Sequence, residues 1–541
     1  MQFQHQFQKI FCFLSFVLLS FPAFGLGEAD TAILQALQQE EPELFERVKL
    51  VKEEDRELLE VTLSDILKMV IKRSMTIEAD RMGEMAAMEG LAGAQGIYQS
   101  YLSASATSAK TASVSSSASS FSSDTASTNY LTSYSTDSTT LSTSLSKKNS
   151  LGISFSTTLQ STTSKTTTYE MADRGDSINE SGSTDPYDGS SLKASVSVPI
   201  FQDWGDINDV SIRRSELSVD QSKVATQSTT NSLLESVAKT YWTMVGVQEN
   251  IKTLQDAVAL SKQLVAETKA RVEVGVLNPT DLKEAETQLA NNQKSLLTKK
   301  IQEQEIEDQI RVALNFGFIP YGFKPADLPR IHGEDFGFNS LLEKAYANSN
   351  TLKNLEISLK SNRYDLDEAY NSDKSNLDLN VSYTLSGWGS STSESVEVFA
   401  NQEYQGYSIG LTWSAPLFDR VTPKTIMKRK IERNKLELQI KDAQSQIHVS
   451  LQTILRNLKF GIREKETALL SVNLAKDLLE KEVEKLKIGK STSYNVSKAQ
   501  QTYTDAKLGE TLVRVGNEQT FISLLVLTGD IFEYFGLPDT I

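Results

Sequence analysis

Apolar residues recur at three- and four-residue steps over two long stretches, from about residue 207 to 274 and from about 425 to 488. Neither stretch contains a proline, and each holds a single glycine. At 1.5 Å per residue, a helix of about 65 residues is roughly 100 Å long. Helices of ordinary globular proteins run to about 20 residues, so the pattern predicts long antiparallel coiled-coil hairpins.

A short motif at the end of the first long helix returns at the end of the second. Glycine leaves a helix in the left-handed conformation at the lowest cost, and Asn278 and Thr492 suit the N-cap of a following helix. Pro279 fits the first helical position, where its missing N–H costs nothing. Each copy therefore predicts a helix, a tight turn and a second helix, with tips at 275–280 and 489–493. Four positions, all at one constant spacing, carry the match: Gly275 with Gly489, Asp281 with Asn495, Leu282 with Val496 and Ala285 with Ala499.

The chain as a whole repeats its outline. A helical pattern at 63–94 returns from Phe338 to Ala369, and the Pro-hydrophobic-Phe junction Pro199–Phe201 returns at Pro416–Phe418. The helix and the junction lie further apart in the first half than in the second, so the first half carries an insertion before its junction. We predict these divisions: a signal peptide at 1–25, an N-terminal extension at 26–60, a first repeat at 61–316, an equatorial connector at 317–337 and a second repeat at 338–541.

Three other stretches alternate apolar and polar residues with period two, at 192–198, 379–385 and 407–413. Each predicted strand has about ten residues and one apolar face, which is typical of a membrane-spanning barrel strand with lipid outside and water inside. A soluble sandwich strand has the same period. The second repeat thus holds a predicted β-hairpin at 376–416.

The insertion is rich in serine and threonine and occupies residues 103–191. Its composition fits a disordered or glycosylated linker. However, Leu141, Thr143 and Leu145 alternate with serines, and alternation resumes from 151 to 159 after a polar turn. This pattern predicts an added β-hairpin, which we expect beyond the membrane, with 171–189 as an exposed loop. Disorder throughout is the alternative.

The N-terminus resembles a secretory signal peptide, with Lys9, an apolar run from Ile10 to Phe24 and a small-residue exit at Gly25. Cys12 is the only cysteine and lies inside that run, so the mature chain has no thiol chemistry. Residues 26–60 are charged and helix-prone. A net charge of −15 argues against a nucleic-acid partner.

A further strand, mostly of Ala and Ser, is predicted near Tyr101 to Val114 and brings the count to four. Four strands cannot close a barrel, because about eight are the smallest number that do. A membrane barrel therefore requires several chains, and three would supply twelve strands. The competing hypothesis is a structural or adhesive coiled-coil surface protein with an exposed Ser/Thr-rich segment. Such a stalk gains nothing from duplicated glycine tips or from alternating strands.

These features together resemble the TolC-type outer-membrane efflux family. The resemblance covers residues 63–537, and no single motif is specific, but their order, spacing and duplication are. It implies an α+β membrane protein: a trimeric outer-membrane β-barrel with four strands per chain, continued by a long periplasmic α-helical coiled-coil tunnel. The residues that carry the resemblance are Arg271–Gly275 with Asp281–Ala285, Leu486–Gly489 with Asn495–Ala499, and the two Pro-hydrophobic-Phe junctions.

The implied function is passive export of solutes or proteins, as the outer-membrane channel of a tripartite efflux or type I secretion system. The implied partners are two further copies of the chain, a periplasmic adaptor (membrane fusion) protein, an inner-membrane transporter of the RND, ABC or MFS type, and outer-membrane lipid. The implied location is the bacterial outer membrane, with a large periplasmic part.

The resemblance also implies roles for single residues. The family's helical tips meet the adaptor, and tightly gated members pair an acidic residue with a tyrosine and an arginine, here replaced by Leu486 and Ser491. The family's acidic pore ring falls on Asn495 and Lys498 and is therefore not preserved in place. The resemblance thus implies that the contacts that usually hold the pore closed are weak or are made by other residues. Lys490 could replace the arginine as a partner for Asp281. The docking residues are Gly275, Val276, Leu277, Asn278, Pro279, Thr280, Gly489, Lys490, Ser491, Thr492 and Ser493; the gate positions are Asp281, Glu284, Leu486, Asn495 and Lys498.

No pattern in the sequence predicts catalysis, and we expect no catalytic residue, metal or cofactor. His332 and His448 are the only histidines after the signal segment and lack metal-ligand spacing. Gly489-Lys490-Ser491 resembles the end of a phosphate-binding loop, but that loop needs a glycine where Glu484 stands.

Overall fold

A computed structural model describes residues 49–53, 56–119, 128–173, 178–315, 322–333 and 337–538. The predicted signal peptide and most of the predicted extension lie outside these residues. The chain forms two compact units. The first comprises Met1–Gly83, Lys223–Asn354 and Lys441–Ile541, and the second comprises Glu84–Ser222 and Leu355–Ile440. None of the helices in the described ranges is both long and apolar enough to cross a bilayer.

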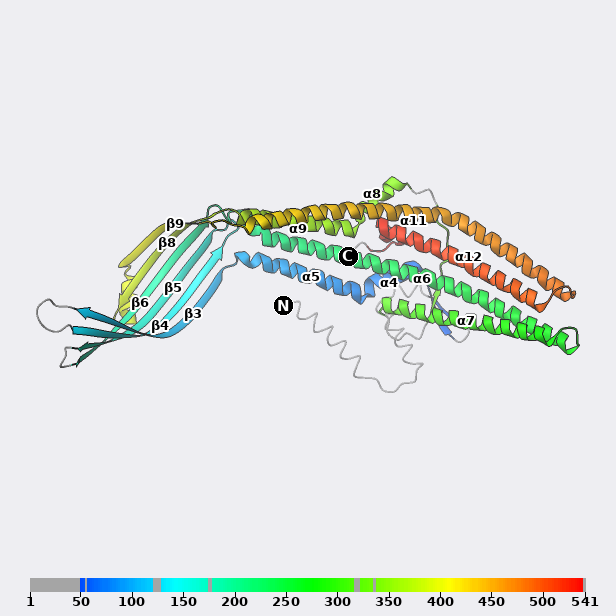
Figure 1. Ribbon diagram of the computed structural model, residues 1–541, viewed down its shortest axis with the longest axis horizontal. Helices are drawn as coiled ribbons and strands as arrows, with labels where there is room; N and C mark the ends of the chain where they lie inside the picture. Colours follow the sequence, from blue (N-terminus) through cyan, green and yellow to red (C-terminus); the bar gives the residue numbers. More distant parts are fainter. Residues whose placement is uncertain are drawn as a thin grey trace. The chain divides into compact units, whose positions relative to one another are not determined.

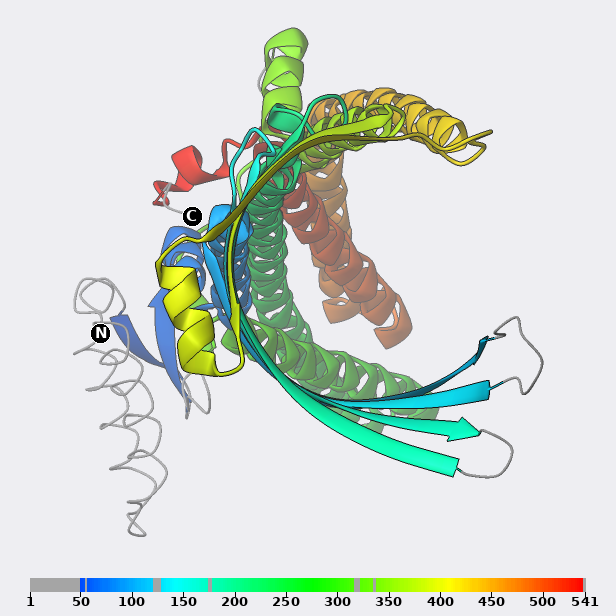
Figure 2. The same cartoon turned by 90° about the vertical axis from the view of Figure 1, so that its left-hand side faces the viewer.

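The second unit is built on a six-stranded antiparallel sheet in the order β3-β4-β5-β6-β8-β9. Figures 1 and 2 show its long strands side by side. Threonine and serine, which fill these strands, alternate with leucine, valine and tyrosine, and β-branched and aromatic residues favour the extended chain. The strands are β3 (Tyr101–Ser119), β4 (Thr128–Lys148), β5 (Ser154–Asp173), β6 (Ile178–Pro199), β8 (Asn376–Gly389) and β9 (Tyr404–Ser414).

The expected four strands per chain are a miscount, because the added hairpin lies within the sheet. Strands β4 and β5 form that hairpin, and they sit between β3 and β6: Leu145 pairs with Leu102, and Leu159 pairs with Leu192. The expected exposed loop at 171–189 is also wrong over most of its length, since β6 begins at Ile178 and pairs with β5. Alternation reveals which face a residue occupies, but it does not reveal which strand lies alongside.

One helix lies on the convex side of this sheet, α10 (Thr392–Ala400), as Figure 2 shows. The Ser395 hydroxyl is fully buried and bonds to the Ser190 hydroxyl at 2.9 Å. The Thr392 hydroxyl donates to the Asp188 carboxylate at 2.6 Å. Ser190 and Asp188 share a face with Leu192 because residues two apart on a strand point the same way. The convex face is therefore the one that carries the apolar residues.

The first unit consists mainly of two long helical hairpins, α6–α7 and α11–α12, which can be followed in Figure 1. Two of these helices, α6 and α11, also run into the second unit. The long helices are α6 (Val210–Glu273), α7 (Pro279–Ala313), α11 (Thr422–Lys487) and α12 (Ser493–Thr528). The shorter ones are α4 (Leu63–Arg73), α5 (Met75–Gln95), α8 (Phe338–Asn348), α9 (Asn350–Ser372) and α13 (Ile531–Phe535), with 3-10 turns η1 (Gly96–Tyr98) and η2 (Asp206–Asp209).

A small sheet accompanies these helices, formed by β1 (Lys49–Glu53), β2 (Arg56–Val61) and β7 (Gly322–Pro325). Strand β2 pairs in parallel with β7, so that Leu58 lies opposite Gly322. The helix-prone reading of 26–60 is wrong for the described part of that range. The mixed charges there favour a helix locally, but pairing with β7, which is distant in the sequence, stabilises the extended chain instead.

The core of the first unit gathers side chains from α4, α6, α12 and β7. Tyr241 of α6 is fully buried in it, and its hydroxyl donates to the Asp327 carboxylate at 2.8 Å. The same carboxylate accepts the Leu63 backbone N–H at 2.7 Å, at the start of α4. Burial, and next the Asp327 carboxylate, raise the pKa of Tyr241, so the hydroxyl stays protonated and remains a donor.

Candidate functional site

The first helical tip is a left-handed turn between α6 and α7. Gly275 has φ +74°, a conformation that glycine adopts at no steric cost. Its N–H donates to the Val272 carbonyl at 3.0 Å, and the Val276 N–H donates to the Arg271 carbonyl at 2.9 Å. This pair of bonds is the Schellman motif, which satisfies the carbonyl groups at a helix end.

The second tip, between α11 and α12, repeats the first in detail. Gly489 also has φ +74°. Its N–H donates to the Leu486 carbonyl at 3.1 Å, and the Lys490 N–H donates to the Lys485 carbonyl at 2.8 Å. The repeat found in the sequence therefore relates the two sets of turn hydrogen bonds as well as the two glycines.

Each tip leads into a capped helix. At the first, the Asp281 carboxylate accepts the Asn278 backbone N–H at 3.1 Å, and Pro279 is the first helical residue. At the second, the Thr492 hydroxyl accepts the Asn495 N–H at 3.4 Å. The caps satisfy N–H groups that a helix start would otherwise leave without partners.

Two side-chain contacts join the hairpins just behind the tips. The Arg271 Nη1 of α6 donates to the Leu486 carbonyl of α11 at 2.8 Å. The Thr268 and Ser493 hydroxyls, both almost fully buried, bond to each other at 2.8 Å. A cation at the carbonyl end of a helix is stabilised by the helix dipole as well as by the bond itself.

An apolar cluster backs these contacts. Leu264 of α6 packs with Leu479 and Leu486 of α11 and with Val496 and Ala499 of α12. The gate position Leu486 is only 4 % exposed, so in the single chain it belongs to this packing between hairpins. Leu486 thus joins the hairpins through both its side chain and its carbonyl.

The remaining gate positions lie outside this apolar cluster. Glu284 and Lys498 line one groove between the first turns of α7 and α12, with a volume of about 420 Å³. Asn495 is exposed. Asp281 is used as a cap, and the hypothesised Asp281–Lys490 ion pair is not among the contacts of the described residues.

Ser491, which stands where the family has an arginine, donates to the Glu482 carboxylate at 2.6 Å. The Lys485 ammonium, and after it Ser491, lower the pKa of Glu482.

Sequence reasoning missed a polar chain inside the hairpin packing. Ser261 of α6 donates to the Gln500 side-chain carbonyl at 3.2 Å, and the Asn292 amide donates to Ser261 at 2.8 Å. Gln500 also donates to the Ala257 carbonyl. The available signal was a glutamine and a serine at core positions of the helical repeat. Buried polar residues at such positions fix the register of packed helices.

The tips themselves present apolar side chains to solvent. Val274 and Val276 flank Gly275 and are 74 % and 70 % exposed, and Ile488 before Gly489 is 68 % exposed. Together the three side chains offer an apolar surface at the paired turns, which suits a contact with another protein.

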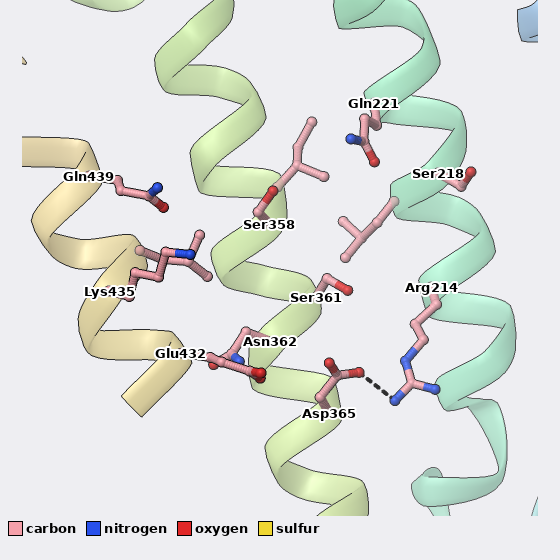
Figure 3. A pocket seen from close by; sticks show the side chains of 13 residues that line it. Arg214, Ser218, Gln221, Ser358, Ser361, Asn362, Asp365, Glu432, Lys435 and Gln439 are labelled. Carbon is pink, nitrogen blue, oxygen red and sulfur yellow. Dashed lines mark ion pairs between the residues drawn. The ribbon is translucent and has the colours of Figure 1, made fainter. Parts of the chain in front are cut away.

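A second cavity, in the other unit, has a volume of about 360 Å³ and lies between α6, α9 and α11 (Figure 3). Arg214 of α6 pairs with Asp365 of α9 at 2.6 Å, as the dashed line in Figure 3 marks. Arg429 of α11 reaches the same carboxylate at 3.1 Å and Glu432 at 2.9 Å. Asp365 is thus held by two arginines, and the cluster ties the three helices together.

Removing the Arg271 side chain is expected to loosen the tips. A hydrogen bond from a charged group contributes about 1.5–3 kcal/mol, and partial exposure puts Arg271→Ala at the lower end of that range. Hydrogen exchange should accelerate at residues 486–493, while exchange in α4 stays unchanged. The control is Lys485→Ala, because Lys485 takes the matching place in the second repeat but pairs locally with Glu482 at 2.7 Å. Equal acceleration in both variants would contradict a special role for Arg271.

Comparison with known proteins adds three findings. The model of the outer membrane efflux protein family matches residues 102–315. No curated protein matches the sequence significantly. Solved structures match over most of the chain, at 11–12 % sequence identity.

The outer membrane protein VceC of Vibrio cholerae is 11 % identical, with a TM-score of 0.59, over 86 % of this chain and 96 % of VceC. The Campylobacter jejuni CmeC outer membrane channel is 12 % identical, with a TM-score of 0.60, over 88 % and 87 %. The open state of the Neisseria gonorrhoeae MtrE outer membrane channel is 12 % identical, with a TM-score of 0.56, over 86 % and 88 %. These matches confirm the expected TolC-like fold of long helices and antiparallel strands, in which barrel closure needs the trimer.

Proposed function

Through residues 102–315 the chain belongs to the outer membrane efflux protein family, and we propose that it is the outer-membrane channel of a tripartite efflux or type I secretion system. TolC-like channels are trimers that act with efflux pumps, and the family is not enzymatic. The chain is an outer-membrane protein whose helices extend into the periplasm. In the proposal, three copies form a passive duct that carries solutes or proteins outward.

The six-stranded sheet carries this proposal. Its outer strands β3 and β9 are paired on one side only, within the described sheet. In a bilayer no water can satisfy the free N–H and C=O groups of such edges, so only a closed barrel is stable there. Six strands are too few to close, which makes further copies of the chain the simplest partners for the two edges.

The tips are proposed to meet a periplasmic adaptor protein, which links the duct to an inner-membrane transporter of the RND, ABC or MFS type. Two similar turns that expose Val274, Val276 and Ile488 support a partner that binds the same kind of surface twice in each chain. In this scheme Glu284, Asn495 and Lys498 line the entrance.

Strain at the tip glycines tests the docking proposal. A side chain in the left-handed conformation costs about 1–2 kcal/mol, and a β-branched one costs more. Gly275→Val and Gly489→Val are therefore expected to reduce export and adaptor capture several-fold while leaving the trimer yield unchanged. The control is Gly509→Val in the middle of α12, where a Cβ would have open space and no positive φ is required. Parental export by both tip variants would contradict the assignment.

Charge at the entrance tests the gate proposal. Asn495→Asp combined with Lys498→Asp would place two carboxylates per chain in one ring, and a ring of like charge concentrates counterions. The cation-to-anion permeability ratio in planar bilayers should rise. The charge-preserving pair Asn495→Gln with Lys498→Arg should leave the ratio near that of the parent. An unchanged ratio in the aspartate variant would mean that these side chains do not line the pore.

A surface stalk is the weaker reading of the same chain. It does not require one apolar face to continue across six strands, and it does not require two Schellman turns to lie together at the end of two hairpins. Detergent extraction separates the two: the channel needs detergent to leave the membrane fraction, and a stalk without a lipid-facing sheet does not.

A further inference from the structure

Most aliphatic residues of the six strands lie in shared rows on one face. In one row, Leu159 of β5 pairs with Leu192 of β6, which pairs with Leu385 of β8. In the next row, Leu102 of β3 pairs with Leu145 of β4. A third row begins with Lys147, the second-last residue of β4, and continues from Phe155 of β5 through Val196 and Val381 to Ile409 of β9. The inserted strands β4 and β5 therefore continue the apolar face of the strands on either side.

The opposite face is lined by hydroxyl groups, and the inserted strands share it too. Cross-strand pairs bond directly: Ser103 with Ser144 at 2.7 Å, Ser156 with Ser195 at 2.7 Å and Ser382 with Ser408 at 2.8 Å. Over the span of the apolar rows, the charged residues on this face are Lys148, Lys193 and Asp378.

We propose that β4 and β5 belong to the membrane wall, and that three chains close an eighteen-stranded pore that admits bulky, weakly charged hydrophilic solutes. This inference rests on the proposed function, because it takes the trimer from it. A hairpin standing in water beyond the membrane would have no reason to keep Leu145, Phe155 and Leu159 on the lipid side and in register with β6.

The strand number sets the width of the pore. With strands about 4.8 Å apart and tilted by about 40°, each strand occupies roughly 6 Å of circumference. Twelve strands then give a barrel about 24 Å across, and eighteen give about 36 Å, since diameter grows almost linearly with strand number. Barrels of 16–18 strands are those that leave an open aqueous channel.

The lining indicates the kind of cargo. Serine and threonine hydroxyls can donate and accept hydrogen bonds and therefore solvate polar groups without selecting a charge. A wide lumen of this kind suits large hydrated molecules better than small ions or apolar compounds.

Cysteine accessibility tests the position of the hairpin, and the sequence suits it because Cys12, its only cysteine, lies in the predicted signal peptide. Ser144→Cys and Thr158→Cys sit on the hydroxyl face, and their neighbours Leu145→Cys and Leu159→Cys sit on the apolar face. In liposomes, a sulfonate-bearing methanethiosulfonate is expected to label the first pair and lower the single-channel current. The second pair should react only with a lipid-soluble maleimide.

Labelling of all four cysteines by the water-soluble reagent, with no change in current, would overturn the inference and place the hairpin outside the membrane. The proposed function fails in a different way, namely if the parent protein forms no conducting channel at all. The labelling pattern is read independently of conductance, so the two failures are distinguishable.

Excision of residues 128–176 tests the width. It removes β4 and β5 and joins the connection after β3 directly to β6. Both strands keep the same face toward lipid, because Leu102 of β3 and Ala194 of β6 already lie in the same row. The largest neutral polymer that enters from the barrel side should shrink by about one third in radius. An unchanged cut-off would overturn the inference. If the excised chain does not assemble, the cysteine labelling decides.

Discussion

Val381→Arg is expected to abolish assembly of the protein in the outer membrane, whereas Ser382→Arg is expected to leave assembly in place. Val381 lies on the apolar face of β8, midway along the strand between Leu377 and Leu385. It pairs with Val196 and Ile409 on the neighbouring strands. Arginine facing lipid at the midplane costs about 2–4 kcal/mol, and a trimer contains the change three times.

Ser382 is the matched control, because it is one residue away and faces the hydroxyl side, where it bonds to Ser408. The measurement is the yield of trimer in purified outer membranes, together with its resistance to unfolding in detergent. Equal yields from the two arginine variants would contradict the assignment of faces.

The second large effect is expected in the core of the helical unit. Tyr241→Ala should destabilise the chain by about 3–5 kcal/mol, because it removes a fully buried ring and leaves a cavity. Tyr241→Phe keeps the ring but leaves the Asp327 carboxylate without its hydroxyl donor, at a cost of about 1–3 kcal/mol. Denaturant unfolding of the three proteins measures both steps.

The Tyr241–Asp327 hydrogen bond also makes the stability of the fold depend on pH. The pKa of Tyr241 is raised above its ordinary value of 10.0 by burial and by Asp327, so folding favours the neutral hydroxyl. The resulting stabilisation is complete below pH 10 and is lost as the pH rises above that value. Tyr241→Phe should abolish this part of the alkaline loss of stability. An identical alkaline profile in parent and variant would contradict the role of the hydroxyl.

Local chemistry made the tips predictable. Gly275, Gly489 and Pro279 each have a conformational preference that few other residues share, and the return of the motif in the second half shows that the same turn is used twice. Both glycines have φ +74°. The adaptor-docking role of these residues stays a prediction.

Pairing between distant segments was not predictable. The parallel contact of β2 with β7 and the insertion of β4 and β5 into the sheet depend on neighbours that period-two alternation does not specify. The polar contacts between hairpins were missed for a similar reason. Arg271 and Thr268 are ordinary helix-surface residues in the sequence, and only packing decides that Thr268 is buried.

The trimeric channel is tested by native mass measurement of the detergent-extracted outer-membrane protein. One species at three times the mass of the mature chain is expected, and this species should conduct ions when reconstituted in a planar bilayer. A monomer that leaves the cell in the soluble fraction and forms no channel would contradict the trimeric channel.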